Sequence, residues 1–305
     1  MELLSIVCPC YNESSCVNGF VEEVVRSVPN GRPYEIVFVD DGSSDDTLSI
    51  IRKLHESNPC VNYVSFSRNF GKEAALLAGL RKARGELVVT MDVDLQDPPS
   101  LLPEMLAGIS EGYDCVATRR CTRKGEPPIR SWFARRFYAL MRRISDVELV
   151  DGARDYRLMR RKVVDAILSM PENNRFTKGI YQWVGFKTKW LSFENVERRA
   201  GETKWNFWKL LVYAVDGILA FTTVPLAIAS WLGLTCCCGS FIYVLWVWLR
   251  VMLYGDPVAG WPSLVCIIVF LGGLQLFVIG ILGAYLSKVY WEAKRRPMYF
   301  IAEES

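Results

Sequence analysis

The sequence predicts an α/β protein in which a mostly parallel, doubly wound sheet domain is followed by interfacial helices and two transmembrane helices. Strands alternate with helices over the first 120 or so residues, and two long apolar runs lie near the C-terminus. Acidic residues directly follow the apolar segment 88–91, and Pro98 and Pro99 prevent that strand from continuing. Ligands of doubly wound sheets bind beyond the carboxyl ends of the strands, so we expect the functional site there.

The expected elements follow from hydrophobic period and turn residues. Strands are expected over residues 3–8, 34–39, 61–66, 88–91 and 113–118, and helices over 17–28, 47–56, 73–83 and 101–110. A helix over 161–168 and an amphipathic strand over 187–196 are expected to complete this part. The sequence therefore divides into a sheet domain of residues 1–200, a juxtamembrane amphipathic helix over 201–222, and a two-helix hairpin with a C-terminal tail over 223–305.

Composition argues against several functions. The formal net charge of the 305 residues is +3, too small to indicate a nucleic-acid partner. The single histidine, with no Cys-x-x-Cys pair among ten cysteines, makes a zinc site unexpected. Neither a Gly-x-Gly-x-x-Gly turn after the first strand nor a P-loop is present, which disfavours dinucleotide dehydrogenases and P-loop ATPases. A nucleotide held by strand-end carboxylates and a metal remains.

The acidic stretch after the fourth strand is the strongest chemical signal. Residues i and i+2 of an extended segment point the same way, so Asp92 and Asp94 could hold one hard cation, with the amide oxygen of Gln96 next on that face. Such a cation would keep open positions for phosphate. The alternative is that these acids only cap the next helix.

Two other charged stretches each have two interpretations. Residues 119–143 are strongly basic, with Trp132, Phe133 and Phe137 at helical spacing. They predict either an amphipathic helix packed on the domain or a helix lying at an anionic membrane surface. Asp155 and Arg157 also have i, i+2 spacing. They are either a structural ion pair or a catalytic carboxylate beside a phosphate-binding arginine.

The apolar runs at 225–249 and 263–286 are each long enough to cross a hydrocarbon core of ~30 Å, although a buried core hairpin is the alternative. Residues 254–262 between them contain no Lys or Arg, whereas Lys204, Lys209 and Lys288 flank the runs. The positive-inside rule then predicts that the sheet domain and the C-terminus are cytoplasmic. Glycines in the second run, such as Gly272 and Gly280, favour close helix contact within or between subunits, hence a homo-oligomer through the membrane helices.

These parts together predict transfer from a soluble activated donor to a lipid acceptor in the bilayer. If the donor is a nucleotide sugar, the cation would neutralise the departing nucleoside diphosphate. A lipid phosphate could attack the anomeric carbon. A phosphate monoester has its second pKa at about 6, so it is already largely nucleophilic and Asp155 would help chiefly by orientation.

Five motifs carry a resemblance to a known family. They are the segments 5–13 (SIVCPCYNE), 39–43 (VDDGS), 67–73 (SRNFGKE), 91–99 (MDVDLQDPP) and 203–206 (TKWN). Together they resemble the inverting glycosyltransferases of family 2, whose fold is the Rossmann-like GT-A fold. The greatest likeness is to polyprenyl-phosphate glycosyltransferases of the bactoprenol glucosyltransferase type, which are related to dolichol-phosphate mannose synthase. The likeness extends through both apolar runs.

The resemblance implies roles for particular residues. The nucleoside would be held by Pro9, Tyr11, Glu13 and Asp41, with Asp92, and the metal, Mg²⁺ or Mn²⁺, by Asp92, Asp94 and Gln96. Asp155 would match the catalytic base and Asp94 would also be catalytic. Phosphates of donor or acceptor would contact Arg119, Arg130, Arg157 and Lys204. Arg154 stands where the family often has glycine, which leaves the backbone and acceptor contacts there open.

The implied function is transfer of a sugar from UDP-glucose or UDP-N-acetylglucosamine to polyprenyl phosphate at the bacterial cytoplasmic membrane, for modification of cell-surface glycans. A flippase and a downstream glycosyltransferase would be pathway partners. A GDP-mannose donor is the alternative. A processive polysaccharide synthase would need a Gln-x-x-Arg-Trp motif, which is absent. A non-catalytic membrane scaffold would not need the intact acidic stretch.

Overall fold

The computed structural model describes residues 1–120, 150, 152–170, 172–173, 175–193, 218–219, 222–254 and 260–305. The chain forms two compact units, and each is described by itself. The first consists of Met1–Ala214 together with Arg296–Ser305, and the second of Val215–Arg295. The predicted basic helix over 119–143 and the juxtamembrane helix over 201–222 lie mostly outside the described residues.

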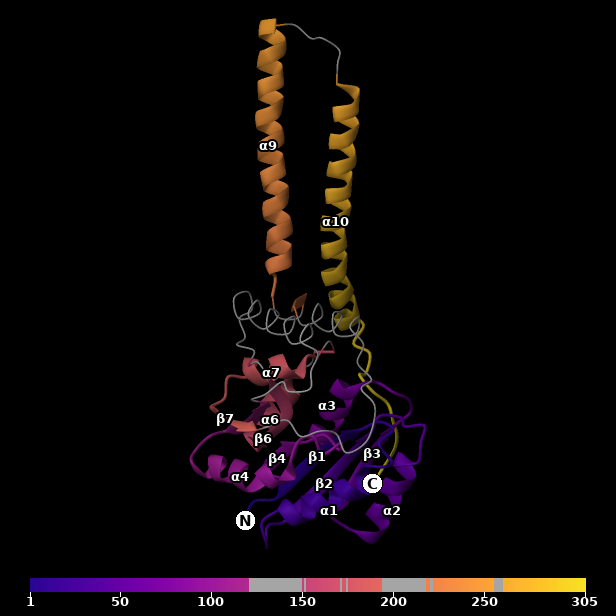
Figure 1. The fold of residues 1–305 in the computed structure, drawn as a ribbon. Helices are drawn as coiled ribbons and strands as arrows, with labels where there is room; N and C mark the ends of the chain where they lie inside the picture. The colour runs from indigo at the N-terminus through magenta and orange to yellow at the C-terminus, as the bar shows by residue number, and fades with distance from the viewer. Residues whose placement is uncertain are drawn as a thin grey trace. The chain divides into compact units, whose positions relative to one another are not determined.

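The first unit is built on one mixed sheet with the order β7-β5-β6-β4-β1-β2-β3-β8 (Figure 1). Its strands are β1 (Leu4–Cys10), β2 (Tyr34–Asp40), β3 (Val61–Phe66), β4 (Leu87–Thr90), β5 (Cys115–Arg120), β6 (Ala153–Arg160), β7 (Thr188–Phe193) and β8 (Ile301–Glu304). The pairs β1-β2, β1-β4, β2-β3 and β5-β7 are parallel. β6 is antiparallel to β4 and β5, and β8 is antiparallel to β3. The predicted mostly parallel sheet is confirmed.

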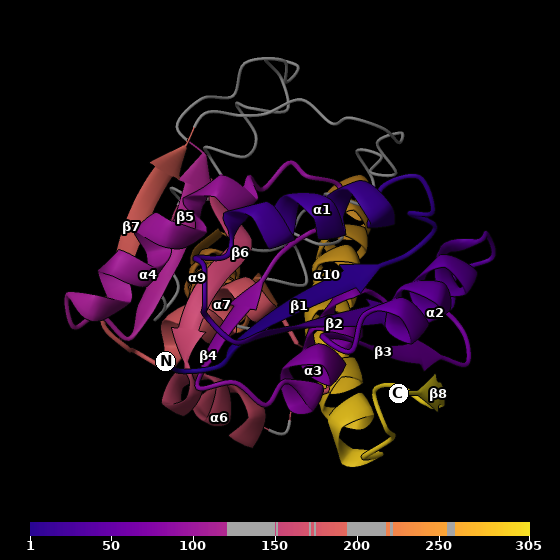
Figure 2. The same ribbon diagram turned by 90° about the horizontal axis from the view of Figure 1, so that it is seen from below.

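Helices cover both faces of this sheet, as expected for strands that are apolar throughout (Figure 2). They are α1 (Val17–Ser27), α2 (Thr47–Ser57), α3 (Lys72–Lys82), α4 (Leu102–Ser110), α6 (Arg161–Ser169) and α7 (Thr177–Trp183), with a short 3-10 turn at Pro99–Leu101. On one face α1, α2 and α4 pack their apolar residues against alternate strand residues such as Ile6 and Phe38. On the other face α3 lies so close that a Cβ on Gly79 would be 2.3 Å from Cγ1 of Val7. This contact packs α3 closely against β1 and β2.

Three elements were not expected from the sequence. β6 replaces the polar cluster predicted around residues 151–157, α7 is an additional short helix, and β8 adds the last residues of the chain to the sheet edge. Polar and apolar residues do not alternate simply along β6, and β8 is only 4 residues long. Long-range pairing rather than local pattern therefore makes them strands.

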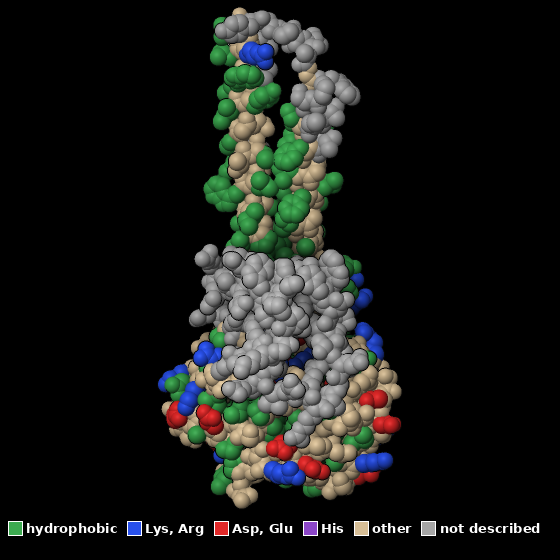
Figure 3. All heavy atoms as spheres, in the orientation of Figure 1, with side chains coloured by type: hydrophobic (Ala, Val, Ile, Leu, Met, Phe, Trp, Pro, Cys, Tyr) green, Lys and Arg blue, Asp and Glu red, His purple; other side chains and the backbone are tan. Residues whose placement is uncertain are grey.

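The second unit contains two long helices, α9 (Val224–Tyr254) and α10 (Trp261–Ala293). Their candidate spans are Val224–Tyr243 and Phe270–Ala293, with 6% and 0% of the apolar windows buried. Hydrophobic side chains lie along the described parts of both helices (Figure 3). A core helix of a soluble protein would be mostly buried, so length, composition and exposure together favour a membrane environment.

Candidate active site

The candidate site lies at the edge of the sheet where the parallel strands β1, β2 and β4 end. β6 runs antiparallel to β4, with Thr90 paired to Arg157, so the first residues of β6 reach this same edge. The hydroxyl of Thr90 donates a hydrogen bond to the backbone oxygen of Asp155. This strand pairing brings Asp155 beside the acidic stretch that follows β4, although the two are more than sixty residues apart in sequence.

Lys72 joins the two acidic segments. Its Nζ lies 2.6 Å from Oδ1 of Asp92 and 2.8 Å from Oδ2 of Asp155. The exposed fractions of the Asp92 and Asp155 side chains are only 23% and 17%. Burial alone would raise the pKa of Asp155, but the Lys72 ammonium, together with Lys178 and Arg154, outweighs it and holds that pKa well below its usual range. Asp155 is therefore a carboxylate at neutral pH.

The segment from Asp94 to Asp97 is a turn rather than an extended strand end. β4 ends at Thr90, Leu95 has a positive φ of 57°, and the Gln96 N–H donates to Oδ1 of Asp94 at 3.1 Å. The argument that Asp92, Asp94 and Gln96 share one face of an extended segment is therefore wrong about the backbone. The turn still keeps all three side chains within one short stretch at the carboxyl edge.

Arg154 occupies the other side of this turn. Its Nε donates to Oδ1 of Asp97 at 2.9 Å, and its Nη2 lies 3.5 Å from Oε1 of Gln96. Asp97 is fully buried, and its Oδ2 has no hydrogen-bond partner within the described part of the chain. Burial raises the pKa of Asp97 while Arg154 opposes that rise. Arg154 thus compensates a buried acid.

Asp41 forms a second polar corner at the same edge. It follows β2, is 4% exposed, and accepts hydrogen bonds from the N–H groups of Phe70 at 2.6 Å and Gly71 at 2.9 Å. Burial raises the pKa of Asp41 despite these two bonds. The loop after β1 is fastened nearby, because the Asn12 N–H donates to Ser43 Oγ at 2.9 Å and Asn12 Oδ1 accepts from the Ser44 N–H at 2.8 Å.

The remaining predicted residues have varied surroundings. Pro9 lies in β1, and Tyr11 and Glu13 follow it in the loop toward α1, all partly exposed. Nε of Arg119, on β5, donates to Ser192 Oγ at 2.9 Å. Arg157 is 2% exposed, with its guanidinium carbon 4.2 Å from the ring centroid of Tyr181. Arg130 and Lys204 lie outside the described residues.

Comparison with known proteins decides the family. Residues 5–168, which include β1 to β6 and the whole acidic turn, match the family described as Glycosyl transferase family 2. The chain belongs to glycosyltransferase family 2. The sheet domain is accordingly the GT-A fold, and the resemblance inferred from the five motifs is confirmed.

Full-length relatives agree with this assignment. The chain is 43% identical over 303 residues to the bactoprenol glucosyl transferase of Shigella phage SfV, covering 99% of this chain and 98% of that protein. It is 43% identical over 300 residues to the prophage bactoprenol glucosyl transferase homolog of Escherichia coli K12, covering 98% of each. Among solved structures, glucosyl-3-phosphoglycerate synthase of Mycobacterium tuberculosis with Mn²⁺ and UDP-glucose is 20% identical, covers 72% of this chain and 77% of that chain, and has a TM-score of 0.48.

In this family 2 glycosyltransferase the donor set of the acidic turn fits a hard divalent cation. Asp92, Asp94 and Gln96 offer carboxylate and amide oxygens, the ligands that Mg²⁺ and Mn²⁺ prefer. Among the residues that the structure describes, no three His, Cys, Asp or Glu side chains gather as a metal site. Within the described residues this turn offers three side chains with oxygen donors, and a cation bound there would complete its coordination with substrate phosphate and water.

Sequence reasoning missed the roles of Lys72 and Arg154. Lys72 is the first residue of α3, directly after the loop that follows β3, so it belongs to the carboxyl edge by topology. The position of Lys72 at the carboxyl edge could therefore be predicted from the sequence. Its ion pair with Asp155 could not, because Asp155 reaches this edge only through the antiparallel pairing of β6.

Proposed function

We propose that this glycosyltransferase transfers glucose from UDP-glucose to polyprenyl (bactoprenol) phosphate at the cytoplasmic face of a bacterial membrane. The observation that carries the proposal is the near full-length likeness to bactoprenol glucosyl transferases. It is supported by the convergence of Asp92, Asp155 and Lys72 at one edge of the sheet.

The reaction exchanges one bond at the anomeric carbon. An oxygen of the polyprenyl phosphate forms a bond to C1 of glucose as the bond from C1 to the UDP oxygen breaks, with inversion at C1. The electron pair of the broken bond leaves with UDP. A divalent cation held by Asp92, Asp94 and Gln96 would stabilise the negative charge on the departing diphosphate.

Asp155 acts mainly by orientation in this proposal. Asp155 is ionised and is held in place by Lys72, and a general base needs both properties. The acceptor phosphate, however, needs little deprotonation at neutral pH. Asp155 and Lys72 would together fix the position from which the phosphate attacks. Arg119, Arg130, Arg157 and Lys204 are proposed to neutralise phosphates of the donor or acceptor, and Pro9, Tyr11, Glu13 and Asp41 to hold the uridine.

The path of the chain supports the proposed membrane topology. Residues 1–120 and 301–304 contribute strands to one sheet, while α9 and α10 lie between them in sequence. A single soluble sheet cannot extend through a bilayer, so both ends of the α9–α10 hairpin belong on one side of the membrane. This favours an even number of spans, with the sheet domain and the C-terminus in the cytoplasm as the charge pattern predicts. Self-association through these helices and transfer of the product to a flippase and a downstream glycosyltransferase stay predictions.

A transfer assay tests the proposal. Full-length protein in detergent or nanodiscs is incubated with polyprenyl phosphate, Mg²⁺ and, in separate reactions, radiolabelled UDP-glucose, UDP-N-acetylglucosamine or GDP-mannose, and label is counted in the organic phase. We expect label from UDP-glucose only, lost with EDTA and reduced at least about 100-fold in Asp94→Asn.

A matched control is Asp114→Asn. Asp114 precedes β5 at the opposite edge of the sheet, where its carboxylate pairs with Lys162 at 2.7 Å. We expect its transfer rate to equal that of the unmodified protein. Label from another donor would show that the proposed donor sugar is wrong. Transfer that is insensitive to EDTA would refute the metal-assisted mechanism. Absence of transfer from any of the donors would favour the scaffold interpretation.

A further inference from the structure

The last residues of the chain complete the sheet of the catalytic domain. β8 pairs with β3, with Val64 opposite Glu304 and Ser65 opposite Glu303, and the register shifts between Ser65 and Phe66. Without β8, β3 would be an open sheet edge with unpaired backbone groups. The C-terminal tail, residues 296–305, is therefore a structural part of the unit that contains the active site.

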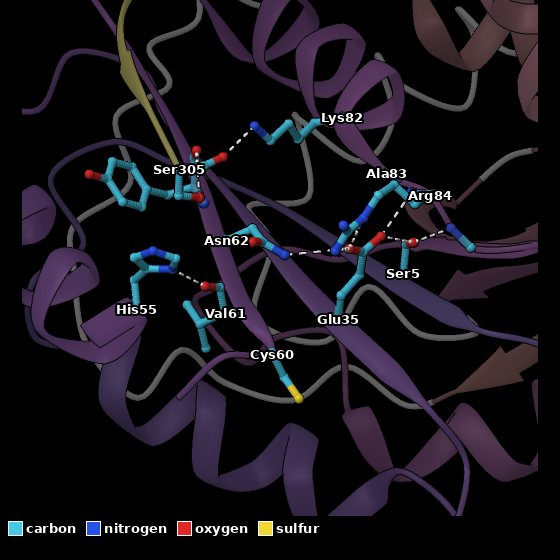
Figure 4. Close-up of polar contacts among 12 residues, drawn as sticks. Ser5, Glu35, His55, Cys60, Val61, Asn62, Lys82, Ala83, Arg84 and Ser305 are labelled. Carbon is cyan, nitrogen blue, oxygen red and sulfur yellow. Dashed lines mark hydrogen bonds and ion pairs between the residues drawn. The ribbon is translucent and has the colours of Figure 1, made fainter. Parts of the chain in front are cut away.

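Polar contacts hold the far end of the tail. Arg52 makes a bidentate contact with Glu303 at 2.8 and 2.7 Å. Lys82 pairs with Glu304 at 3.0 Å and with the terminal Ser305, whose position beside Lys82 is visible in Figure 4. The Ser305 N–H donates to the Tyr63 oxygen at 3.1 Å. These contacts fix where β8 lies along β3.

Aromatic contacts at the near end of the tail reach the loop that follows β3. The Tyr299 ring stacks on Phe66 with centroids 4.8 Å apart, and the Phe300 ring lies 6.2 Å from that of Phe70. The Phe300 carbonyl oxygen accepts a hydrogen bond from the Ser67 N–H at 3.0 Å. The tail thus contacts both the first and the fourth residue of the segment 67–71.

The same segment contacts Asp41 on its other side. The Phe70 and Gly71 N–H groups bind the Asp41 carboxylate, and a Cβ on Gly42 would lie 2.5 Å from the backbone of Arg68. A hollow of about 250 Å³ beside it is lined by both strand-end loops and by Ala302 and Glu303 of the tail. The segment 67–71 is therefore held between Asp41 and the C-terminal tail.

We propose that Tyr299 and Phe300 are positioning residues that set the donor-binding geometry of Asp41 through the segment 67–71. This inference rests on the proposed function, in which Asp41 holds the nucleoside of the donor. Without the two rings, Phe66 and Phe70 lose their outer partners and the segment gains conformational freedom. Donor binding must then restore the order that the tail provides, so donor affinity falls. Lys72 and Asp155, the residues proposed to position the acceptor, lie on α3 and β6 outside this segment, and α3 is held separately by its close contact with Val7 at Gly79.

The test compares the unmodified full-length protein with Tyr299→Ser/Phe300→Ser. UDP binding in the presence of Mn²⁺ is measured by calorimetry, and KM is measured for UDP-glucose and for polyprenyl phosphate. We expect UDP affinity to fall about 10-fold and the KM for donor to rise similarly, with the KM for acceptor unchanged. Trypsin cleavage after the exposed Arg68 should become faster in the double variant and slower again when UDP is added.

Glu304→Gln is the matched control, because it weakens the tail at the Lys82 end and leaves both rings in place. We expect its UDP affinity to be unchanged. If the double variant does not fold, Phe300→Ser alone replaces it, since the Phe300 side chain is already 58% exposed. Equal UDP affinity in the variant and the unmodified protein, or an equal rise of both KM values, would overturn this inference and leave the proposed function unaffected. Failure of the unmodified protein to bind UDP would overturn the proposed donor and this inference together.

Discussion

Carboxylates lie at both edges of the sheet, but their surroundings differ. At the amino edge Glu35 accepts hydrogen bonds from Ser5 Oγ at 2.6 Å, from the Arg84 backbone N–H at 2.8 Å, and from the Arg84 side chain at 3.0 and 2.8 Å (Figure 4). At the carboxyl edge Asp92 and Asp155 share the single ammonium of Lys72.

The difference separates an acid with a structural role from the two acids that we propose to be functional. Glu35 accepts from Ser5 on β1, from Asn62 on β3 at 3.4 Å and from Arg84 after α3, and one of the Arg84 donors is a backbone N–H that cannot swing aside as a side chain can. Asp92 and Asp155 are paired through one long side chain that is 43% exposed and can swing aside. A divalent cation can therefore take the place of the Lys72 ammonium beside Asp92 without breaking the fold, whereas a ligand beside Glu35 would have to displace a backbone N–H.

The largest effect expected from this comparison is the loss of kcat in Asp155→Asn. The amide keeps the shape of the side chain but removes the charge that holds the Lys72 ammonium toward the attacking phosphate, so kcat should fall about 10²–10³-fold while the urea midpoint changes little. Single-turnover transfer and urea unfolding measure the two quantities.

Asp165→Asn, an exposed acid on α6, serves as its control and should leave both quantities unchanged. A kcat within about 3-fold of the unmodified enzyme would show that Asp155 is a structural ion-pair partner only.

Lys72→Met should separate metal binding from catalysis. Without the ammonium, Asp92 loses its direct ion-pair partner, so donor-free protein should bind Mn²⁺ several-fold more tightly. The two carboxylates then repel each other, and kcat should fall about 100-fold. Paramagnetic resonance of free Mn²⁺ gives the affinity, and the transfer assay gives the rate.

The matched change is Lys162→Met, which removes the Lys162 pairing with Asp114 at the amino edge. Neither Mn²⁺ affinity nor kcat should change. If Lys72→Met bound Mn²⁺ as the unmodified protein does, Lys72 would not compete with the cation.

Glu35→Gln should lower stability and spare activity. The amide can accept at one oxygen only and turns its NH₂ toward the Arg84 donors, which costs about 2 kcal/mol; the Arg84 side chain is 72% exposed, so its share is small. Burial alone would raise the pKa of Glu35, but the Ser5 and Arg84 hydrogen bonds lower it overall. An acid with a lowered folded pKa stabilises the fold above its ordinary pKa of about 4.3, and this contribution is lost as pH falls through the folded value.

Urea midpoints of the unmodified protein and Glu35→Gln should therefore differ at pH 7 and converge in acid. The exposed pair Glu22–Arg26, at 3.7 Å, gives the comparison, since Glu22→Gln should cost less than about 0.5 kcal/mol. A constant difference between Glu35→Gln and the unmodified protein from pH 7 down to pH 3 would contradict the role of the Glu35 charge.

The five strands expected before residue 120 and the two long apolar helices were predictable because each is encoded by a local pattern. The positions of Asp41 and Asp92 at the carboxyl edge were also predictable, because the topology of a parallel sheet brings the ends of its strands together. The backbone of the acidic turn was not predictable, because the positive φ of Leu95 and the Asp94–Gln96 hydrogen bond depend on how the turn packs.

The sequence by itself determined the alternation of strands and helices, the acidic stretch after β4, the two apolar runs and, through its motifs, the family. Only the tertiary structure decided that β6 enters antiparallel between β4 and β5, that Asp155 thereby meets Lys72 and Asp92, and that β8 closes the edge beside β3. The physical reason is that hydrophobic period and turn chemistry act over a few residues. The pairing of distant strands, and the charges that it brings within 3 Å of one another, depends on the whole sheet.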